Sequence, residues 1–192
     1  MKTGLLFGSF NPIHIGHLAI ANYFTEYSDI DQAWFVVSPQ NPLKERSNLL
    51  EDYHRLHLVN LAIEGFSKFK SCNIEFSLPK PSFTIDTLMY LSEKYPFYKF
   101  VLIIGGDNVP TFEKWKNYRE IIRQFEVYVY PRPGINLNDI LQEFPTFKVF
   151  NAPLIEISSS FIRSSIRDKK DMRFFLNEKD FEYIREMHFY EK

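Results

Sequence analysis

The 192-residue sequence contains a single cysteine, Cys72, and no long apolar run. One cysteine excludes an internal disulfide framework and a multi-cysteine zinc site, and it fits a reducing compartment. The longest apolar stretch, residues 100–104, is far shorter than the roughly 18 residues that a membrane span requires. The first residues also lack the apolar run of a signal peptide. We therefore expect a cytoplasmic protein without a membrane segment, in which Cys72 is inert packing.

An excess of either charge is missing as well. The chain has 23 basic and 24 acidic residues, which gives a formal net charge of −1. The lack of an overall basic field argues against a general DNA or RNA binder, although local basic clusters are compatible with this composition. There is no repeat, low-complexity run or Gly/Ser linker. The length fits one domain spanning residues 1–192, with a helical part from about residue 158. The oligomeric state stays open, and a homo-oligomer is compatible with the sequence.

Short apolar runs alternate along the chain with segments of helical periodicity. Predicted strands cover residues 3–7, 33–38, 73–76, 99–104, 126–130 and 148–150. Predicted helices cover residues 15–27, 50–65, 84–95, 117–124, 159–167 and 178–187. This alternation predicts an α/β fold, a mainly parallel sheet flanked by helices on both faces. Ligands of such sheets lie beyond the carboxyl ends of the strands, so we expect functional residues in the loops after Phe7, Val37, Ile104 and Tyr130.

The loop after the first predicted strand has features that suit a phosphate chain. Residues 8–17 read GSFNPIHIGH. Gly8 can expose backbone amides, and a helix that begins near Ile15 presents free N–H groups and a positive dipole end. His14 and His17 are three residues apart, so both can face one bound group. A Walker lysine, a three-glycine dinucleotide fingerprint and further zinc ligands are missing. The alternative is two exposed histidines in an ordinary loop.

A second segment, residues 157–163, reads ISSSFIR. Serines before an apolar-periodic helix are typical N-cap residues, and they place hydroxyls and free amides at the helix N-terminus. Arg163 lies one turn inside the same helix and can contact an anion there. The alternative is a plain capped helix with a solvated arginine, and Arg167 is interpreted as a surface residue.

Both segments resemble the signatures of the adenylyltransferase and cytidylyltransferase superfamily. The first is similar to G-x-F-D-P-x-H-x-G-H, with Asn11 in place of the common Asp. The second is similar to I-S-S-T-x-I-R, with Ser160 in place of Thr. The resemblance implies a Rossmann-like, doubly wound fold and the transfer of a nucleotidyl group from a nucleoside triphosphate, with release of pyrophosphate.

Further segments resemble the nicotinate-mononucleotide adenylyltransferases. These are residues 39–44 (PQNPLK), 82–88 (SFTIDTL) and 104–107 (IGGD), followed by Trp115. The resemblance runs from residue 8 to residue 163 and implies ATP and nicotinate mononucleotide as substrates. It implies deamido-NAD as a product and Mg²⁺ bound with ATP as cofactor. The ion would be held mainly by phosphate oxygens and water, without protein side chains.

The resemblance also assigns roles to residues. His17 and His14 are the expected catalytic residues. The residues expected at ATP and its phosphates are Gly8, Ser9, Phe10, Lys44, Gly105, Asp107, Ser158, Ser159, Ser160 and Arg163. The residues expected at nicotinate mononucleotide are Ser82, Phe83, Thr84 and Trp115. Independently of the resemblance, the pattern predicts that Thr84 caps the helix at residues 84–95. His54 and His57 are interpreted as structural or solvated.

Two alternatives stay open. One is a sister transferase that acts on another phosphorylated acceptor, such as nicotinamide mononucleotide or phosphopantetheine. The other is a module that binds a nucleotide without turnover.

Overall fold

The computed structural model describes residues 1–39 and 49–192 and contains a six-stranded, fully parallel sheet. The strand order is β3-β2-β1-β4-β5-β6. The strands are β1 Lys2–Gly8, β2 Gln32–Val37, β3 Phe69–Cys72, β4 Lys99–Gly105, β5 Glu126–Tyr130 and β6 Lys148–Val149. The order reverses between β1 and β4, as in a Rossmann-like doubly wound sheet. The predicted fold class is confirmed.

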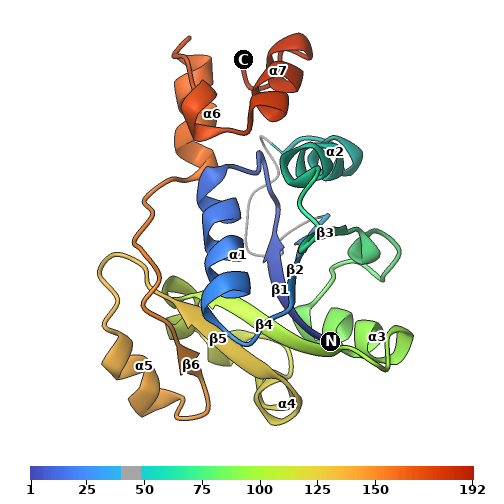
Figure 1. Ribbon diagram of the computed structural model, residues 1–192, viewed down its shortest axis with the longest axis vertical. Coiled ribbons are helices and arrows are strands. Elements are labelled where there is room, and N and C mark those ends of the chain that lie inside the picture. The colour runs from blue at the N-terminus through green and yellow to red at the C-terminus, as the bar shows by residue number, and fades with distance from the viewer. Residues whose placement is uncertain (40–48) are drawn as a thin grey trace.

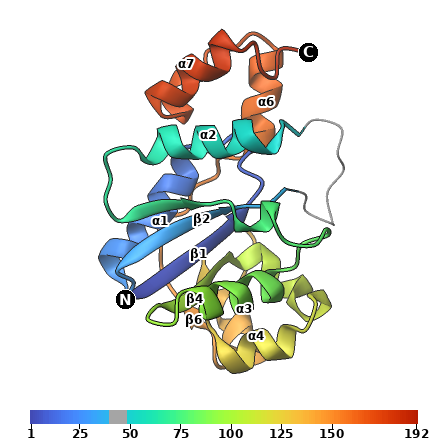
Figure 2. The same cartoon turned by 90° about the vertical axis from the view of Figure 1, so that its right-hand side faces the viewer.

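Helices cover both faces of this sheet (Figures 1 and 2). The α-helices are α1 Ile15–Tyr27, α2 Asp52–Ile63, α3 Thr84–Lys94, α4 Tyr118–Gln124, α5 Leu137–Glu143, α6 Ser159–Arg167 and α7 Glu178–Glu186. One apolar core lies between the sheet and α1, α2, α6 and α7. A second lies between the opposite face and α3, α4 and α5. Because both faces are covered, the central strand β2 is buried along its whole length.

The prediction of a strand at residues 73–76 was wrong. The strand in this region is β3, and Ile74–Phe76 forms a short 3₁₀ helix instead. The turn buries the carboxylate of Glu75, which accepts hydrogen bonds from the hydroxyls of Ser82 and Thr87. Helix α5 and the 3₁₀ helix Gly106–Lys114 were also missed. The latter contains Pro110 within its span.

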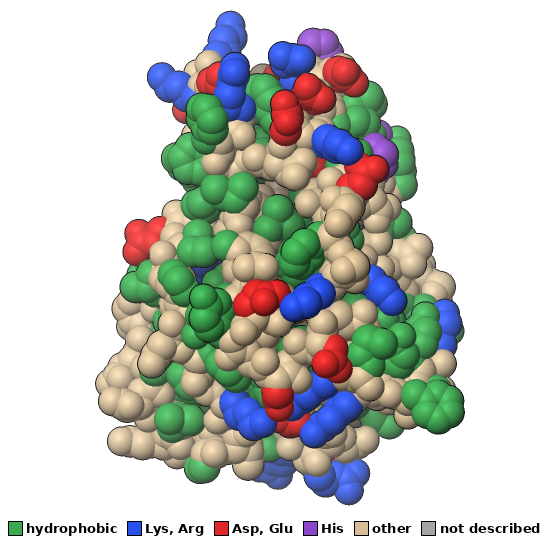
Figure 3. All heavy atoms as spheres, viewed as in Figure 1, with side chains coloured by type: hydrophobic (Ala, Val, Ile, Leu, Met, Phe, Trp, Pro, Cys, Tyr) green, Lys and Arg blue, Asp and Glu red, His purple; other side chains and the backbone are tan. Residues whose placement is uncertain are grey.

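The surface carries mixed charge. On the face drawn in Figure 3, basic and acidic side chains are interspersed, including around α6 and α7 at the top. Among the helices of the described residues, none is both long and apolar enough to cross a bilayer.

A buried carboxyl in α7 makes stability depend on pH. Asp180 is fully buried, and within residues 1–39 and 49–192 neither carboxyl oxygen has a hydrogen-bond partner. Burial raises the pKa of Asp180 from 3.8 to about 8. The unfolded chain therefore releases this proton at lower pH than the folded chain does. Stability should fall as the pH rises from about 4 to about 8.

We expect Asp180→Asn to remove this dependence. Between about pH 5.5 and about pH 7.5 the wild-type protein should lose at most about 2.5 kcal/mol through this group, whereas the variant should lose far less. Thermal unfolding as a function of pH checks the expectation. The control is Asp171→Asn, since Asp171 is exposed and ion-paired with Arg173. Parallel curves for the wild type and Asp180→Asn would contradict the assignment.

Candidate active site

The candidate site lies at the carboxyl edge of the sheet, where the strand order reverses. Strands β1 and β4 are neighbours and end at Gly8 and Gly105. The loop after β1 leads to His14 and His17, and the turn after β4 carries Asp107. A ligand of a doubly wound sheet binds in the crevice outside such a switch point. Two of the loops expected to carry function, those after β1 and β4, therefore lie at the same edge of the sheet.

His14 and His17 stack at the start of α1. Their ring centroids are 3.7 Å apart, and the backbone N–H of His14 donates to Nδ1 of His17 at 3.3 Å. His14 is only 4% exposed, and its Nδ1 has no partner in the described part of the chain. Burial, together with the nearby positive charge of Arg132, lowers the pKa of His14 to about 4. His14 is therefore neutral at physiological pH, and His17 is the more accessible of the two imidazoles.

Two glycines allow this loop to pack closely. A Cβ at Gly8 would lie 2.9 Å from the ring of Phe10, and a Cβ at Gly16 would lie 3.0 Å from Nδ1 of His14. Gly8 thus serves for close approach rather than for a positive φ. Phe10 itself has a φ of 45°, and its buried ring meets His17 edge to face at 5.1 Å. The ring of Phe10 is therefore part of the core rather than of the site surface.

The N-terminus of α6 packs directly against the same loop. Ser158 is the N-cap, and its hydroxyl accepts from the N–H of Phe161 at 3.1 Å. The hydroxyl of Ser159 donates to the carbonyl of Pro12 at 2.9 Å. Arg163 donates through Nη1 to the carbonyl of Asn11 at 2.8 Å. The two segments that suggested anion sites, about 150 residues apart in the chain, therefore form one surface.

Arg132 is a candidate that the sequence did not identify. It follows β5, and its Nε lies 3.4 Å from the Asp107 carboxylate. Its guanidinium also lies over the ring of Tyr130, 5.1 Å from the centroid. Together with its effect on His14, these contacts place a cation beside the histidine pair. The sequence did indicate its location, because Arg132 lies in the loop after Tyr130, one of the four loops expected to carry functional residues.

Arg55 in α2 was also missed. It is fully buried, and its Nη1 donates to the carbonyls of Ser9 at 2.5 Å and Ser38 at 2.7 Å. It therefore ties the loop after β1 to the loop after β2. The sequence signal was the position of Arg55 on the buried stripe of α2, with Leu58, Val59 and Ala62.

The N-terminus of α3 carries the residues expected at nicotinate mononucleotide. The N-cap is Phe83 without a side-chain hydrogen bond, and Thr84 is the first helical residue, so the expected Thr84 cap was wrong. The hydroxyl of Ser82 is buried and donates to Glu75 at 2.9 Å, which anchors this end of the helix. Trp115 is half-buried, with its ring 5.1 Å from that of Phe112. Both Phe83 and Trp115 pack at the border of one apolar core.

Lys44, which is expected at the phosphates of ATP, lies outside the described residues. Among residues 1–39 and 49–192, no three His, Cys, Asp or Glu side chains gather closely enough to hold a metal ion.

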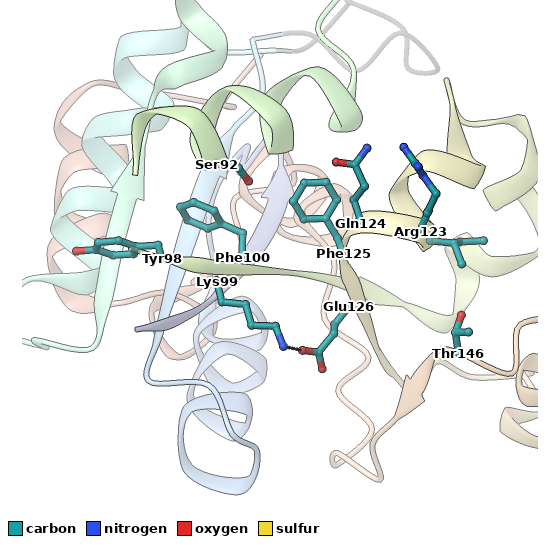
Figure 4. Close-up of a pocket in the computed structure, with 10 residues that line it drawn as sticks. Ser92, Tyr98, Lys99, Phe100, Arg123, Gln124, Phe125, Glu126 and Thr146 are labelled. Atoms are coloured by element: carbon teal, nitrogen blue, oxygen red, sulfur yellow. Dashed lines mark ion pairs between the residues drawn. The ribbon is translucent and has the colours of Figure 1, made fainter. Parts of the chain in front are cut away.

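A separate hollow of about 420 Å³ lies at the opposite edge of the sheet (Figure 4). It is lined by the first residues of β4 and β5, Lys99 and Glu126, which form an ion pair. Since the histidine pair follows the carboxyl end of β1, this hollow does not belong to the candidate site.

Comparisons with known proteins identify the family. The cytidylyltransferase-like family matches residues 5–165. A probable nicotinate-nucleotide adenylyltransferase of Flavobacterium psychrophilum is 50% identical over 195 aligned residues, which cover 100% of both chains. A protein of the same description from Bacteroides thetaiotaomicron is 50% identical over 187 residues, which cover 97% of this chain and 92% of the relative. The chain belongs to the nicotinate-nucleotide adenylyltransferase family.

A solved structure of such an adenylyltransferase shares the fold. The Plasmodium falciparum nicotinic acid mononucleotide adenylyltransferase complexed with NaAD has a TM-score of 0.82 and 21% identity. The match covers 99% of this chain and 97% of that chain. The solved structure thus supports the Rossmann-like fold of the chain. The family resemblance in the sequence is confirmed by the family match and the relatives that are 50% identical.

Proposed function

We propose that this protein transfers the adenylyl group of ATP to the phosphate of nicotinate mononucleotide, giving deamido-NAD and pyrophosphate in NAD biosynthesis. The observation that carries the proposal is the contact between the loop of the histidine pair and the N-terminus of α6, through Ser159 to Pro12 and Arg163 to Asn11. It creates one surface with two helix N-termini, two imidazoles and a guanidinium, which suits a polyphosphate.

The reaction requires positioning and charge stabilisation. The acceptor phosphate is already an anion at neutral pH, so it attacks the α-phosphorus in line without a general base. The bond from the α-phosphorus to the bridging oxygen breaks, and the electron pair leaves with pyrophosphate. What the protein must supply is the alignment of two anions and donors toward the developing charge.

We assign the donors by their place in the site. His17, the more accessible imidazole, stabilises charge on the α-phosphate in the transition state. The neutral His14 holds a neighbouring phosphate oxygen through a ring N–H. Arg163 and the amides of residues 158–160 hold the β- and γ-phosphates, together with Lys44. The backbone of residues 8–10 and Gly105 borders the nucleotide, and Asp107 accepts from its ribose hydroxyls.

Arg132 extends this assignment. Its guanidinium lies beside the histidine pair and is well placed to hold the phosphate of the second substrate. An arginine can bind a phosphate through two N–H donors, which fixes its orientation as well as its position.

Mg²⁺ accompanies ATP in this proposal. The side chains assigned to the site are cationic or neutral apart from the Asp107 carboxylate, so the residues present fit an ion held by phosphate oxygens and water. Such an ion neutralises phosphate charge while the side chains position the reacting groups.

Pyrophosphate release tests the function. Purified protein with MgATP and nicotinate mononucleotide should release pyrophosphate and form a dinucleotide. Phosphopantetheine and ribose 5-phosphate serve as control acceptors. No release with nicotinate mononucleotide, or equal release with a control acceptor, would overturn the proposal.

We expect a preference for nicotinate over nicotinamide mononucleotide. The N-terminus of α3 at Phe83 and Thr84 presents backbone donors, which suit a carboxylate, whereas an amide would place its NH₂ against them. A charge-assisted hydrogen bond contributes about 1.5–3 kcal/mol, so kcat/KM should differ by about 10- to 100-fold. The measurement is pyrophosphate release with each mononucleotide. Equal kcat/KM values would disprove the assignment of α3 while leaving the reaction intact.

A further inference from the structure

The C-terminal segment reaches back to the loop of the histidine pair. Tyr190 lies 13 residues after the N-cap of α7, and its hydroxyl donates to Oδ1 of Asn11 at 2.8 Å. Figures 1 and 2 show the C-terminus beside α6 and α7, at the end of the molecule where α1 begins. The contact therefore joins residues 179 positions apart in the chain.

Asn11 links Tyr190 to Arg163. Its Oδ1 also accepts from the N–H of Leu50 at 3.2 Å, and its backbone carbonyl accepts from Nη1 of Arg163 at 2.8 Å. Tyr190 and Arg163 in addition line the same surface hollow of about 410 Å³. Asn11 thus contacts Tyr190 through its side chain and Arg163 through its backbone carbonyl.

The backbone of Tyr190 has a conformation that non-glycine residues seldom adopt, with a φ of 66°. Its side chain packs against the core that lies between the sheet and α1, α2, α6 and α7. Burial raises the pKa of Tyr190, so the hydroxyl stays protonated at neutral pH and acts as a donor. A sparsely populated backbone conformation, held by packing, serves here to aim one hydroxyl at the loop.

We propose that Tyr190 is a positioning residue for ATP: through Asn11 it holds Arg163 in the orientation that binds the β- and γ-phosphates. This inference rests on the proposed function of Arg163. Tyr190 does not touch the reacting atoms. Its loss should therefore weaken the binding of ATP and leave the binding of nicotinate mononucleotide unchanged.

The test is Tyr190→Phe, which removes only the hydroxyl. We expect the KM for ATP to rise about 3- to 10-fold, the range for losing one hydrogen bond, with less than about a 2-fold change in the KM for nicotinate mononucleotide. The matched control is Tyr183→Phe. Tyr183 lies in the same C-terminal part, but its hydroxyl contacts Nδ1 of His54 at 2.7 Å rather than the loop.

A double-mutant cycle distinguishes positioning from structure. In an Arg163→Ala background, Tyr190→Phe should add little, because Tyr190 acts through Arg163. Three results would overturn the inference: an unchanged KM for ATP, full additivity with Arg163→Ala, or an equal rise of both KM values with a lower melting temperature.

The Kd of a non-hydrolysable ATP analogue, measured by calorimetry, tests the inference independently of the proposed function. If the wild type binds the analogue but releases no pyrophosphate, the proposed function fails. The ratio of Kd values for the wild type and Tyr190→Phe still decides the inference, because it does not require turnover.

Discussion

Replacing His17 with alanine should lower kcat about 10²- to 10³-fold with a much smaller change in KM. This is the usual effect of removing one donor that acts mainly in the transition state, and it corresponds to roughly 2.7–4 kcal/mol. The structure favours His17 for this role because its ring is the more accessible member of the stacked pair. Steady-state kinetics of pyrophosphate release provide the measurement.

His17 also has a local structural role, which a second variant separates. Its Nδ1 accepts from the backbone N–H of His14, so alanine removes a contact at the start of α1 as well as a donor to substrate. Asparagine at this position keeps a short side-chain acceptor but lacks the imidazole. We expect His17→Asn to lose nearly as much turnover as His17→Ala, with a melting temperature closer to that of the wild type.

The control for this pair is His57→Ala, because His57 is an exposed histidine on α2. It should keep full turnover. Near-normal kcat in His17→Asn would show that the imidazole is not the transition-state donor, whatever happens to His17→Ala.

The residues of the first loop could be predicted from the sequence because their chemistry is local. A strand, a glycine, two histidines and a helix start follow each other within residues 8–17, and the structure has α1 beginning at Ile15 as expected. The same holds for the Ser158 cap of α6. What a sequence pattern could not provide is the contact of Ser159 and Arg163 with this loop, which depends on how α6 packs.

The missed residues act over long sequence separations. Arg132 reaches Asp107 because β5 ends beside β4. Tyr190 reaches Asn11, 179 positions earlier in the chain, because the C-terminal segment folds back onto the first loop. The wrong strand at residues 73–76 has a similar cause. Its alternating pattern resembles a strand. The hydrogen-bond partners of Glu75, however, are Ser82 just before α3 and Thr87 within it, and the Glu75 carboxylate reaches them from a 3₁₀ turn. Tertiary contacts, and not local propensity, determined these three cases.

The second large effect should come from Arg55. Its fully buried guanidinium donates to four backbone carbonyls, those of Ser9, Ser38, Pro39 and Leu50, and pairs with Asp52 at 2.5 Å. These carbonyls belong to the loop after β1, the loop after β2 and the residues just before α2, so one side chain connects three segments. Removing the guanidinium alone leaves its buried hydrogen-bond partners unpaired, which costs stability.

We expect Arg55→Met to lower the free energy of unfolding by about 3–5 kcal/mol, because methionine fills similar space but leaves the carbonyls and Asp52 without a donor. For a chain of this length the melting temperature should fall by roughly 10 °C. Thermal and urea unfolding measure the change. Arg119→Met, which removes an exposed arginine from α4, is the matched control and should change the melting temperature by no more than about 2 °C.

Arg55→Lys then separates charge from geometry. Lysine keeps the positive charge but presents it as a single ammonium, which cannot span the carbonyls of Ser9, Ser38 and Leu50 as the planar guanidinium does. We therefore expect Arg55→Lys to be nearly as destabilised as Arg55→Met and, where it folds, to show higher KM values for both substrates, since the loops after β1 and β2 lose their common anchor. A lysine variant as stable as the wild type would show that charge alone suffices, and that the fork of hydrogen bonds does not hold the two loops together.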